Sequence, residues 1–468
     1  MTDLPSPNPS CPGCIALMKE LMSLKVIVEE QGVEITRLKA QLQRTSRTSS
    51  KPPSSDAPWD KGASKRSPSG KKRGGQPGHK GKNRPPASPG DVGETHSIKA
   101  TLCGSCSAPL TGNDPNPRLH QTIDIRPVTP QVIELQLHQL RCTKCGKSTR
   151  ADLPKGVHPS AFGPNLSSLV VQLSGEYRMS RRSIQRFVRD IHGIQISLGA
   201  ISKLEQRISR GLKIAHVEAM TSVATSPTKH LDETTWRQSS KLKWVWTAVG
   251  EDATVFVIRD SRESSVTREL IGDKPSGIVI SDRYSGYSYI EMEQRQVCLA
   301  HLLRDFRRMA EGEEAHRWIG KRLLGLLNGA FRLWHIFRDD EIDRITLARW
   351  SRKLRVRMLR LLDEGGRSTG YETPGMCRGI LRTEPAMWTF IERENVEPTN
   401  NIAERAIRPV VLLRKTSLGS QSDRGNRFVE RMQTVSATLK KTGRSVHDFI
   451  GEVAHAVLLG DPLPKLLV

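Results

Sequence analysis

Three acidic residues occupy positions in the sequence where folded proteins often carry metal-binding carboxylates. Asp232 lies in the stretch KHLDETTWRQ, Asp282 follows the apolar stretch GIVIS, and Glu404 lies in NNIAERAIRP. Carboxylates suit Mg²⁺ or Mn²⁺, and two such ions stabilise the attacking and the leaving oxygen in phosphoryl transfer. A lone acid at a strand end is usually structural. If the three acids meet, however, the pattern predicts metal-dependent phosphoryl transfer on DNA.

The stretch from 229 to 282 indicates how two of the acids would meet. It predicts three short strands, a helix and then a buried strand that ends at Asp282. This order is typical of a ribonuclease-H-like α/β core, with Asp232 and Asp282 on adjacent central strands. Glu233 would face the other side of its strand, so we exclude it from the ligands and expect its replacement to hurt far less.

The third acid would arrive from a helix far along the chain. Residues 310–396 have helical periodicity throughout and predict a helical insertion, whose tryptophans are interpreted mainly as core. Glu404 is then expected inside a short helix that is capped by Asn or Thr and interrupted before Pro409.

Paired cysteines indicate a second metal. Cys103, Cys106, Cys142 and Cys145 form the pattern C-x2-C-x35-C-x2-C, with a strand-like stretch between the pairs. Four thiolates at this spacing suit a closed tetrahedral site, so we predict a zinc ribbon with structural Zn²⁺. A third pair, at 11 and 14, has no second pair to complete a site and is interpreted as metal-free.

Residues 163–212 have the plan of helices separated by short turns. Ser180 and Ser197 are candidate N-caps, and a glycine-containing turn between the two helices is typical of a helix-turn-helix. The second helix would then present Lys203 and Arg207 outward to DNA. Helical hairpins also serve as plain scaffolding, and that alternative stays open.

The N-terminal part predicts self-association and a basic arm. Apolar residues alternate in steps of four and three over 15–45, which favours a coiled coil over a single amphipathic helix on a globular body. Residues 46–100 are rich in Ser, Pro and basic residues. Their lysines and arginines, among them Lys71, Lys72 and Arg73, would contact DNA phosphates, although a solvated linker is the plainer alternative.

The composition limits the class of partner. The 468 residues carry 73 Lys and Arg against 49 Asp and Glu, a formal net charge of +24. Such an excess favours double-stranded DNA over an anionic membrane surface. The sequence has no apolar run that would span a bilayer and no pattern of a signal peptide. We therefore expect a cytoplasmic, nucleoid-associated protein with no membrane partner.

Taken together, these motifs resemble those of the bacterial insertion-sequence transposases of family 66, whose catalytic subunit is an Asp-Asp-Glu enzyme. The resemblance covers nearly the whole chain, and its most specific block is the last. It is carried by SSKPPSSD, GGQPGHKG, DETTWR, SDRYSGY, CLAHLLRDF and NNIAERAIRPVVLLRK. The N-terminal CPGC and the stretch 417–427 depart from the family pattern without touching the acids.

The resemblance implies a role for each matching residue. Asp232, Asp282 and Glu404 match the three catalytic acids, and Cys298 and His301 match a supporting C-x-x-H element that follows the second acid. DNA phosphates or the flanking core are the implied partners of Arg405, Arg408 and Lys415. The implied activity is cleavage and strand transfer at terminal inverted repeats, with a homodimer or higher oligomer and two small element-encoded accessory proteins. A structure-selective nuclease or a non-catalytic DNA-binding regulator are the alternatives.

The expected architecture is a multidomain α+β protein. Its parts are a coiled coil (15–45), a basic linker (46–100), a zinc ribbon (101–155), a helix-turn-helix-like domain (160–225), the first part of the ribonuclease-H-like core (226–310), a helical insertion (311–396) and the second part of the core (397–460).

Overall fold

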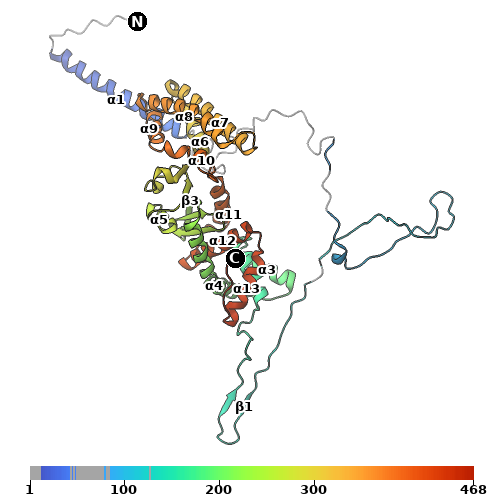
Figure 1. Cartoon of the computed structure of the whole chain (residues 1–468). Coiled ribbons are helices and arrows are strands. Elements are labelled where there is room, and N and C mark those ends of the chain that lie inside the picture. Colours follow the sequence, from blue (N-terminus) through green and yellow to red (C-terminus); the bar gives the residue numbers. More distant parts are fainter. Residues whose placement is uncertain are drawn as a thin grey trace. The chain divides into compact units, whose positions relative to one another are not determined.

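The computed structural model describes residues 12–42, 45, 48, 78–80, 85–125 and 128–467. It divides into two compact units, one formed by residues 1–60 and 132–468 and the other by residues 61–131. The three candidate acids belong to the first unit. Figure 1 shows the chain with its main helices and strands labelled. Lys71, Lys72 and Arg73 lie outside the described residues, as does Cys11.

A five-stranded mixed sheet forms the centre of the first unit, with the strand order β5-β4-β3-β6-β7. The strands are β3 (Thr228–Gln238), β4 (Lys241–Val249), β5 (Thr254–Arg259), β6 (Ile278–Ser281) and β7 (Arg295–Val297). The first three strands pair antiparallel, whereas β3, β6 and β7 pair parallel. The strands expected within 229–282 and the helix α5 (Ser264–Ile271) are therefore confirmed. In the described part of the strand-like stretch between the cysteine pairs, the only strand is β1 (Gln139–Arg141), which pairs with β2 (Ser148–Arg150). The sequence did not predict β7, because three residues are too few to show a period.

The two faces of the sheet pack against different helices. One face joins α2 (Pro164–Gly175), α3 (Arg181–His192), α4 (Leu198–Thr225), α12 (Asp423–Lys441) and α13 (Val446–Leu459) in a single apolar core. On the other face, Trp236 and Val245 pack against α11 (Asn401–Ser417). The helices expected as a separate DNA-binding domain thus share their core with the sheet.

The predicted helix boundaries of α3 and α4 are confirmed. The side chains of Ser180 and Ser197 each accept a hydrogen bond from the backbone N–H three residues on, at 3.1 Å. Gly193 ends α3 in the left-handed region, with φ 67°, a conformation that costs glycine little. α4 continues for 28 residues, so its second half lies under the sheet, where His216 contacts the carbonyl of Phe256 at 3.0 Å.

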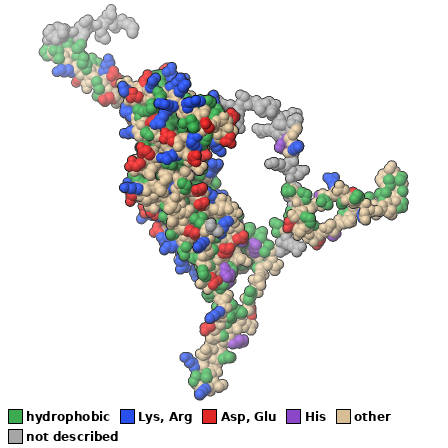
Figure 2. All heavy atoms as spheres, viewed as in Figure 1, with side chains coloured by type: hydrophobic (Ala, Val, Ile, Leu, Met, Phe, Trp, Pro, Cys, Tyr) green, Lys and Arg blue, Asp and Glu red, His purple; other side chains and the backbone are tan. Residues whose placement is uncertain are grey.

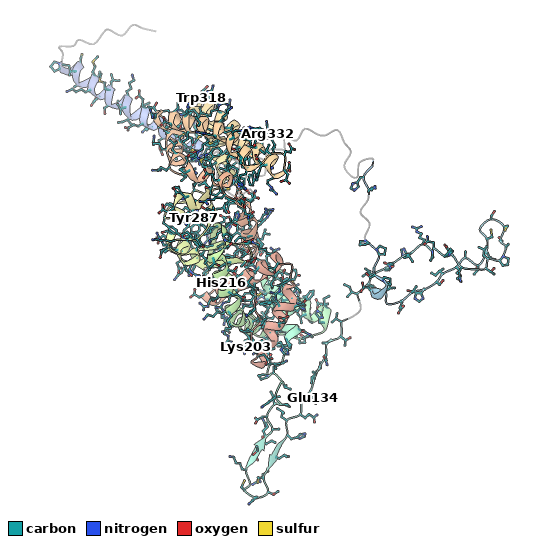
Figure 3. The ribbon with its side chains drawn as sticks, in the orientation of Figure 1. Glu134, Lys203, His216, Tyr287, Trp318 and Arg332 are labelled. Carbon is teal, nitrogen blue, oxygen red and sulfur yellow. The ribbon has the colours of Figure 1, made fainter. Side chains whose placement is uncertain are left out.

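The helical insertion is present and has its own core. It follows α6 (Leu299–Glu311) and consists mainly of α7 (Arg317–Arg338), α8 (Arg344–Arg367), α9 (Thr373–Leu381) and the short α10 (Thr389–Glu392). Trp334 and Trp388 are buried in this core, whereas Trp318 (Figure 3) and Trp350 are exposed, so only half of the four tryptophans match the expectation. The segments that precede and follow the insertion lie side by side, because the N–H of Leu299 donates to the carbonyl of Pro398 at 2.9 Å.

α11 differs from the expected short helix. It runs unbroken through Pro409, and its N-cap Asn400 makes no side-chain capping bond. Packing explains the continuity: Ile407, Val410 and Leu413 lie in the core under the sheet. Arg414 also ties the helix to Thr234 and Thr235 of β3. These contacts outweigh the one hydrogen bond that a proline removes.

Side chains cover both edges of the sheet. Along β5, the N–H groups of Thr254, Phe256 and Ile258 donate to residues of α12, namely Thr438, Thr434 and Glu430. Along β7, the amide of Gln296 accepts from the backbone of Phe390, and Thr389 donates to the carbonyl of Arg295. An exposed strand edge would otherwise carry unpaired donors and acceptors.

The N-terminal stretch forms α1 (Pro12–Leu42), a helix of 31 residues that Gly32 does not break. Its expected seam residues are solvent-exposed in the single chain; Leu21 is 59% exposed and Val28 64% exposed. The helix is thus confirmed, and its self-association stays a prediction. None of the helices in the described part of the chain is both long and apolar enough to cross a membrane.

Candidate active site

Asp232 and Asp282 lie side by side at the centre of the sheet. β3 and β6 pair in parallel with Thr228 opposite Ile278 and His230 opposite Ile280. Asp282 directly follows the last residue of β6, so the same register places it beside Asp232. Even-numbered residues of β3 share the face of Trp236, which packs on α11. Asp232 therefore faces the helix that carries the third acid.

Glu404 lies in the first turn of α11 and is one-third exposed. Its Oε1 atom is buried and has no hydrogen-bond partner. Nδ1 of His301 and Nη2 of Arg304 each lie 3.7 Å from Oε1, too far for a hydrogen bond. The carboxylate thus offers a buried lone pair with no donor assigned to it.

The pKa of Asp232 reflects the charges around it. Burial raises its pKa well above the ordinary value of an aspartate, and the negative charges of Glu233, Asp282 and Glu404 raise it further. One backbone hydrogen bond, from the N–H of Glu233 at 3.0 Å, opposes this shift. Asp232 is thus a carboxylate held among like charges, an arrangement that a cation would relieve.

Glu233 has a quite different environment, which the sequence did not predict. It is nearly buried, accepts two hydrogen bonds from Arg262 at 3.0 and 2.6 Å, and accepts a third from the hydroxyl of Tyr287 at 2.6 Å. The guanidinium of Arg262 also stacks on Tyr284, 3.9 Å from the ring centre. Glu233 is therefore a partnered structural acid on the opposite face of β3.

Asn400 connects the segments that carry the acids. Its side-chain N–H donates to the carbonyl of Leu231 at 2.6 Å, beside Asp232, and its Oδ1 contacts His230 at 3.2 Å. Its backbone N–H donates to Sγ of Cys298, and its carbonyl accepts from the N–H of Glu404 at 3.1 Å. The sequence marked Asn400 only as a possible cap, because hydrogen bonds across 170 residues leave no local pattern.

The supporting residues Cys298 and His301 lie beside Glu404, at the start of α6. Cys298 is fully buried, and burial raises the pKa of its thiol to about 11. Burial lowers the pKa of His301, and the nearby charge of Arg304 lowers it further. This element therefore lies beside Glu404, and its supporting role stays a prediction.

The two cysteine pairs form the same turn twice. The N–H of Cys103 donates to the carbonyl five residues on, and its carbonyl accepts from the N–H of Ser107, at 2.9 Å each. Cys142 makes the matching bonds, at 2.8 and 2.9 Å, to Lys147 and Gly146. In each turn, the backbone N–H of the second cysteine lowers the pKa of the first thiol. Cys103 and Cys106 fall in one unit and the other pair in the other unit, so the described geometry does not test a shared zinc ion.

The face of α4 expected to read DNA is only partly free. Lys203 is exposed (Figure 3), as expected, but Arg207 is half-buried. Ser202 and Gln206 accept hydrogen bonds from Arg424 of α12, at 3.5 and 3.3 Å. The outward orientation expected for this face is thus confirmed for Lys203 alone.

A basic row on α11 is better exposed. Arg405, Arg408 and Lys415 are exposed, and their spacing of three and seven residues places them within one sector of the helix. Glu404 borders the same sector. On the face of the molecule in Figure 2, Lys and Arg are spread among acidic residues rather than gathered in one patch, so the row on α11 is distinguished by its place beside the acids.

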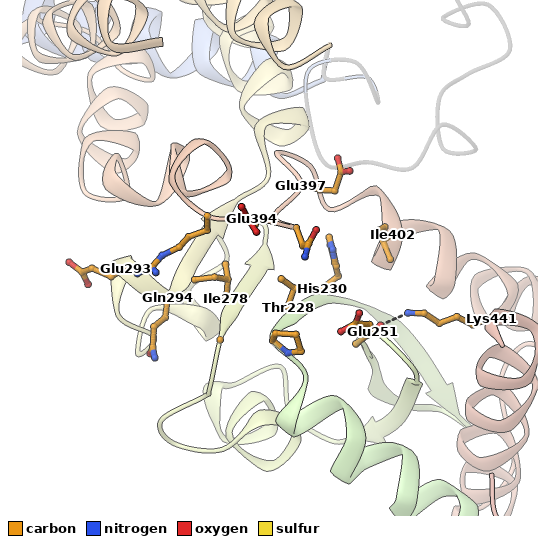
Figure 4. A pocket seen from close by; sticks show the side chains of 15 residues that line it. Thr228, His230, Glu251, Ile278, Glu293, Gln294, Glu394, Glu397, Ile402 and Lys441 are labelled. Atoms are coloured by element: carbon orange, nitrogen blue, oxygen red, sulfur yellow. Dashed lines mark hydrogen bonds between the residues drawn. The ribbon is translucent and has the colours of Figure 1, made fainter. Parts of the chain in front are cut away.

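A cavity of about 610 Å³ lies at the opposite end of β3 and β6 from the acids (Figure 4). Thr228, His230 and Ile278 line it, together with Glu251, Glu293, Glu394, Glu397 and Lys441. None of the three candidate acids lines this cavity. Burial lowers the pKa of His230 to about 4, so the imidazole is neutral near pH 7.

Comparison with known proteins finds a family model described as "Transposase IS66 family" that matches residues 159–427. A model described as "Family of unknown function" matches residues 10–85. Two curated relatives from Sinorhizobium fredii (strain NBRC 101917 / NGR234) are named uncharacterized proteins. One, y4qI, is 25% identical over 253 residues, 48% of this chain and 45% of its own length. The other, y4hP, is 24% identical over 379 residues, 73% of this chain and 67% of its own length. This chain thus spans less than half of the first relative.

Proposed function

Because the chain belongs to the transposase IS66 family, we propose that it binds the terminal inverted repeats of its element and catalyses metal-dependent DNA cleavage and strand transfer. The observation that carries the proposal is the pairing of β3 with β6, which places Asp282 beside Asp232 on the face that packs against α11. Asp232, Asp282 and Glu404 come from a strand, a strand end and a distant helix, yet the negative charges of Asp282 and Glu404 both act on Asp232. Scaffolding acids are normally paired with cations. Among the described residues, Asp232 and Asp282 form no ion pair, and Glu404 has only the 3.7 Å contacts with Arg304 and His301.

Asp232, Asp282 and Glu404 would hold two Mg²⁺ (or Mn²⁺) ions. The fit rests on their mutual repulsion and on the unpartnered Oε1 of Glu404. When bound, the ions neutralise charge that develops on the attacking and leaving oxygens of the DNA. The charges of both other acids act on Asp232, so this carboxylate would be central to holding the ions. Asn400 acts as a positioning residue, since it joins the segments of Asp232 and Glu404.

The sheet topology supports a ribonuclease-H-like core in two parts, 226–310 and 397–460, with the helical insertion 311–396 between them. Three antiparallel strands followed by two parallel ones, with the first acid on the first strand and the second after the fourth, are what this core requires. The helix-turn-helix-like helices 160–225 would then act as a buttress of this core that exposes Lys203 to DNA.

DNA phosphates are the partners we propose for the row on α11. An arginine donates to a phosphate in a bidentate manner, and Arg405 and Arg408 flank the acid where the scissile phosphate would lie. Lys203, Arg207 and the basic arm with Lys71, Lys72 and Arg73 would add contacts that do not read sequence.

The remaining assignments concern assembly. We propose that Cys103, Cys106, Cys142 and Cys145 hold structural Zn²⁺, because each pair already forms a turn that lowers a thiol pKa. The exposed apolar row of α1 would join two chains or more as a coiled coil over 15–45. Two small accessory proteins and a place at the nucleoid complete the proposal.

A cleavage assay tests the proposed chemistry. Purified protein is incubated with Mg²⁺ and a labelled inverted-repeat end, and Asp232→Asn, Asp282→Asn and Glu404→Gln are compared with wild type. Glu364→Gln is the matched control, since Glu364 is an exposed glutamate on α8 of the insertion. We expect loss of cleavage in the three variants and full cleavage in the control. Wild-type cleavage by all three would overturn the mechanism.

The products of the same assay separate the alternatives. Strand-transfer products support a transposase, whereas cleavage without joining would support a structure-selective nuclease. Sequence-specific binding that is independent of Mg²⁺, with no cleavage by wild type, would support a non-catalytic regulator.

A further inference from the structure

Three different ligand types meet at the junction of α6 and α11. The thiol of Cys298, the imidazole of His301 and the carboxylate of Glu404 each place one ligand atom within 4.8 Å of the other two. In the described part of the chain, no other set of three Cys, His, Asp or Glu residues has this arrangement. The cysteine turns and the three acids discussed above are thus separate from it, except that Glu404 belongs to both.

Two of these ligand atoms are buried without a hydrogen-bond partner. They are Nδ1 of His301 and Oε1 of Glu404, and they lie 3.7 Å apart. Buried polar atoms are normally satisfied, so an orphaned pair calls for a physical cause. Two ligands on one tetrahedral Zn²⁺ at usual bond lengths lie roughly 3.4–3.6 Å apart. The observed separation is close to that value and too long for a direct hydrogen bond.

The backbone holds the three ligands on a fixed frame. Cys298 is the N-cap residue of α6, His301 lies in its first turn and Glu404 in the first turn of α11. The N–H of Leu299 donates to the carbonyl of Pro398, and the N–H of Asn400 donates to Sγ of Cys298 at 3.1 Å. The N–H of Asn400 lowers the pKa of the Cys298 thiol, but burial has the larger effect, so a metal ion would have to displace the thiol proton when it binds.

We propose that Cys298, His301 and Glu404 bind a Zn²⁺ ion beside the catalytic acids. Thiolate, imidazole and carboxylate together suit a borderline transition metal and not Mg²⁺, which prefers oxygen ligands alone. Three protein ligands leave one position for water or for a DNA oxygen. In this structure, Nη2 of Arg304 lies 3.7 Å from Oε1 of Glu404 and is the nearest guanidinium nitrogen to it among the described residues.

The ion would fix the third acid in place. Cys298 and His301 precede the helical insertion and Glu404 follows it, so one ion would tie its two ends together. The zinc ion would bind Oε1 of Glu404 and leave the other carboxylate oxygen for the catalytic ions. This consequence rests on the proposed role of Glu404, but the zinc site itself does not.

Metal content of the full-length chain tests the site. Protein saturated with Zn²⁺ and desalted is expected to hold about two zinc ions per chain, one at the cysteine turns and one here. Cys298→Ser and His301→Asn should each lose one ion, whereas Cys103→Ser should lose the other. Cys377→Ser is the matched control, because Cys377 is equally buried but has no ligand neighbours; it should lose none. Unchanged zinc content in both Cys298→Ser and His301→Asn would overturn the proposal.

Cobalt substitution guards against a variant that merely misfolds. Co²⁺ bound by Cys298 gives a thiolate-to-metal absorption, measured in a Cys103→Ser, Cys106→Ser background that removes the first cysteine turn. His301→Asn, at the partly exposed rim, should weaken Co²⁺ binding about tenfold or more and keep a native circular dichroism spectrum. No cobalt absorption in the folded background protein would also refute the site. Cleavage by the same proteins is scored separately, so that failure of the zinc site and failure of the transposase chemistry are distinguishable.

Discussion

The two faces of β3 treat neighbouring acids in opposite ways. Asp232 faces α11, lies among like charges and has its pKa raised well above normal. Glu233 faces the other core, where Arg262 and Tyr287 occupy its oxygens. The difference teaches that burial alone does not mark a functional acid: the structural acid is matched by donors, whereas the functional candidate is left with charge that only a ligand can neutralise.

The largest effect on activity is expected from replacing Asp232, on the face of β3 that packs against α11. Asp232→Asn should lower cleavage by about 10³-fold or more, since several kcal/mol of charge stabilisation are lost. The same change should raise the melting temperature of the metal-free protein, because it removes repulsion with Asp282 and Glu404. Cleavage kinetics and calorimetry measure the two effects. A variant that loses both activity and stability would break the comparison.

Replacement of Glu233, on the other face of β3, should lower stability more than activity. Glu233→Gln is expected to lower the free energy of unfolding by roughly 2–3 kcal/mol, because Arg262 loses its buried partner. The partial exposure of the Arg262 side chain reduces this loss. Denaturant unfolding measures this cost. Glu233→Gln is thus no control for stability, although its replacement is still expected to reduce activity far less than that of Asp232. Activity per folded molecule should still exceed that of Asp232→Asn by far.

Tyr287→Phe sharpens the comparison with a smaller change. It removes one hydrogen bond to Glu233 and keeps the ring in the core, so the expected cost is about 1–2 kcal/mol. Denaturant unfolding of Tyr287→Phe, Glu233→Gln and the double variant gives their coupling. Additive losses would show that the hydroxyl does not act through Glu233.

The smallest effect is a dependence on pH. Because the pKa of Asp232 is raised on folding, the folded protein holds this proton more tightly than the unfolded one. Its contribution to stability is present below the ordinary pKa of an aspartate and is lost as pH rises through the raised value. In metal-free protein, Asp232→Asn should flatten this fall in melting temperature. The remaining slope belongs to Glu233, whose pKa is also raised.

The sequence predicted those parts of the site that depend only on residues close together in the chain. The alternation of side chains along β3 predicted which face of the sheet Asp232 occupies. The apolar stretch before Asp282 predicted where β6 ends. The serine caps of α3 and α4 followed from single residues.

Features that depend on distant partners were not predictable in this way. The contacts of Asn400 with Leu231 and Cys298 join segments far apart in the chain. The burial of Glu233 depends on Arg262, a residue with no distinguishing neighbours. The unbroken course of α11 depends on core contacts that offset Pro409. In each case tertiary packing overrides the local rule.

The covered edges of the sheet bear on how copies of this protein can associate. Threonine and glutamate side chains of α12 occupy β5, and Thr389 with the amide of Gln296 occupies β7. These contacts occupy hydrogen-bonding groups that a strand from another molecule would need, and so they disfavour growth of the sheet by edge pairing. If copies of this chain associate, we expect them to do so through helices such as α1, which can assemble and come apart without unfolding the sheet.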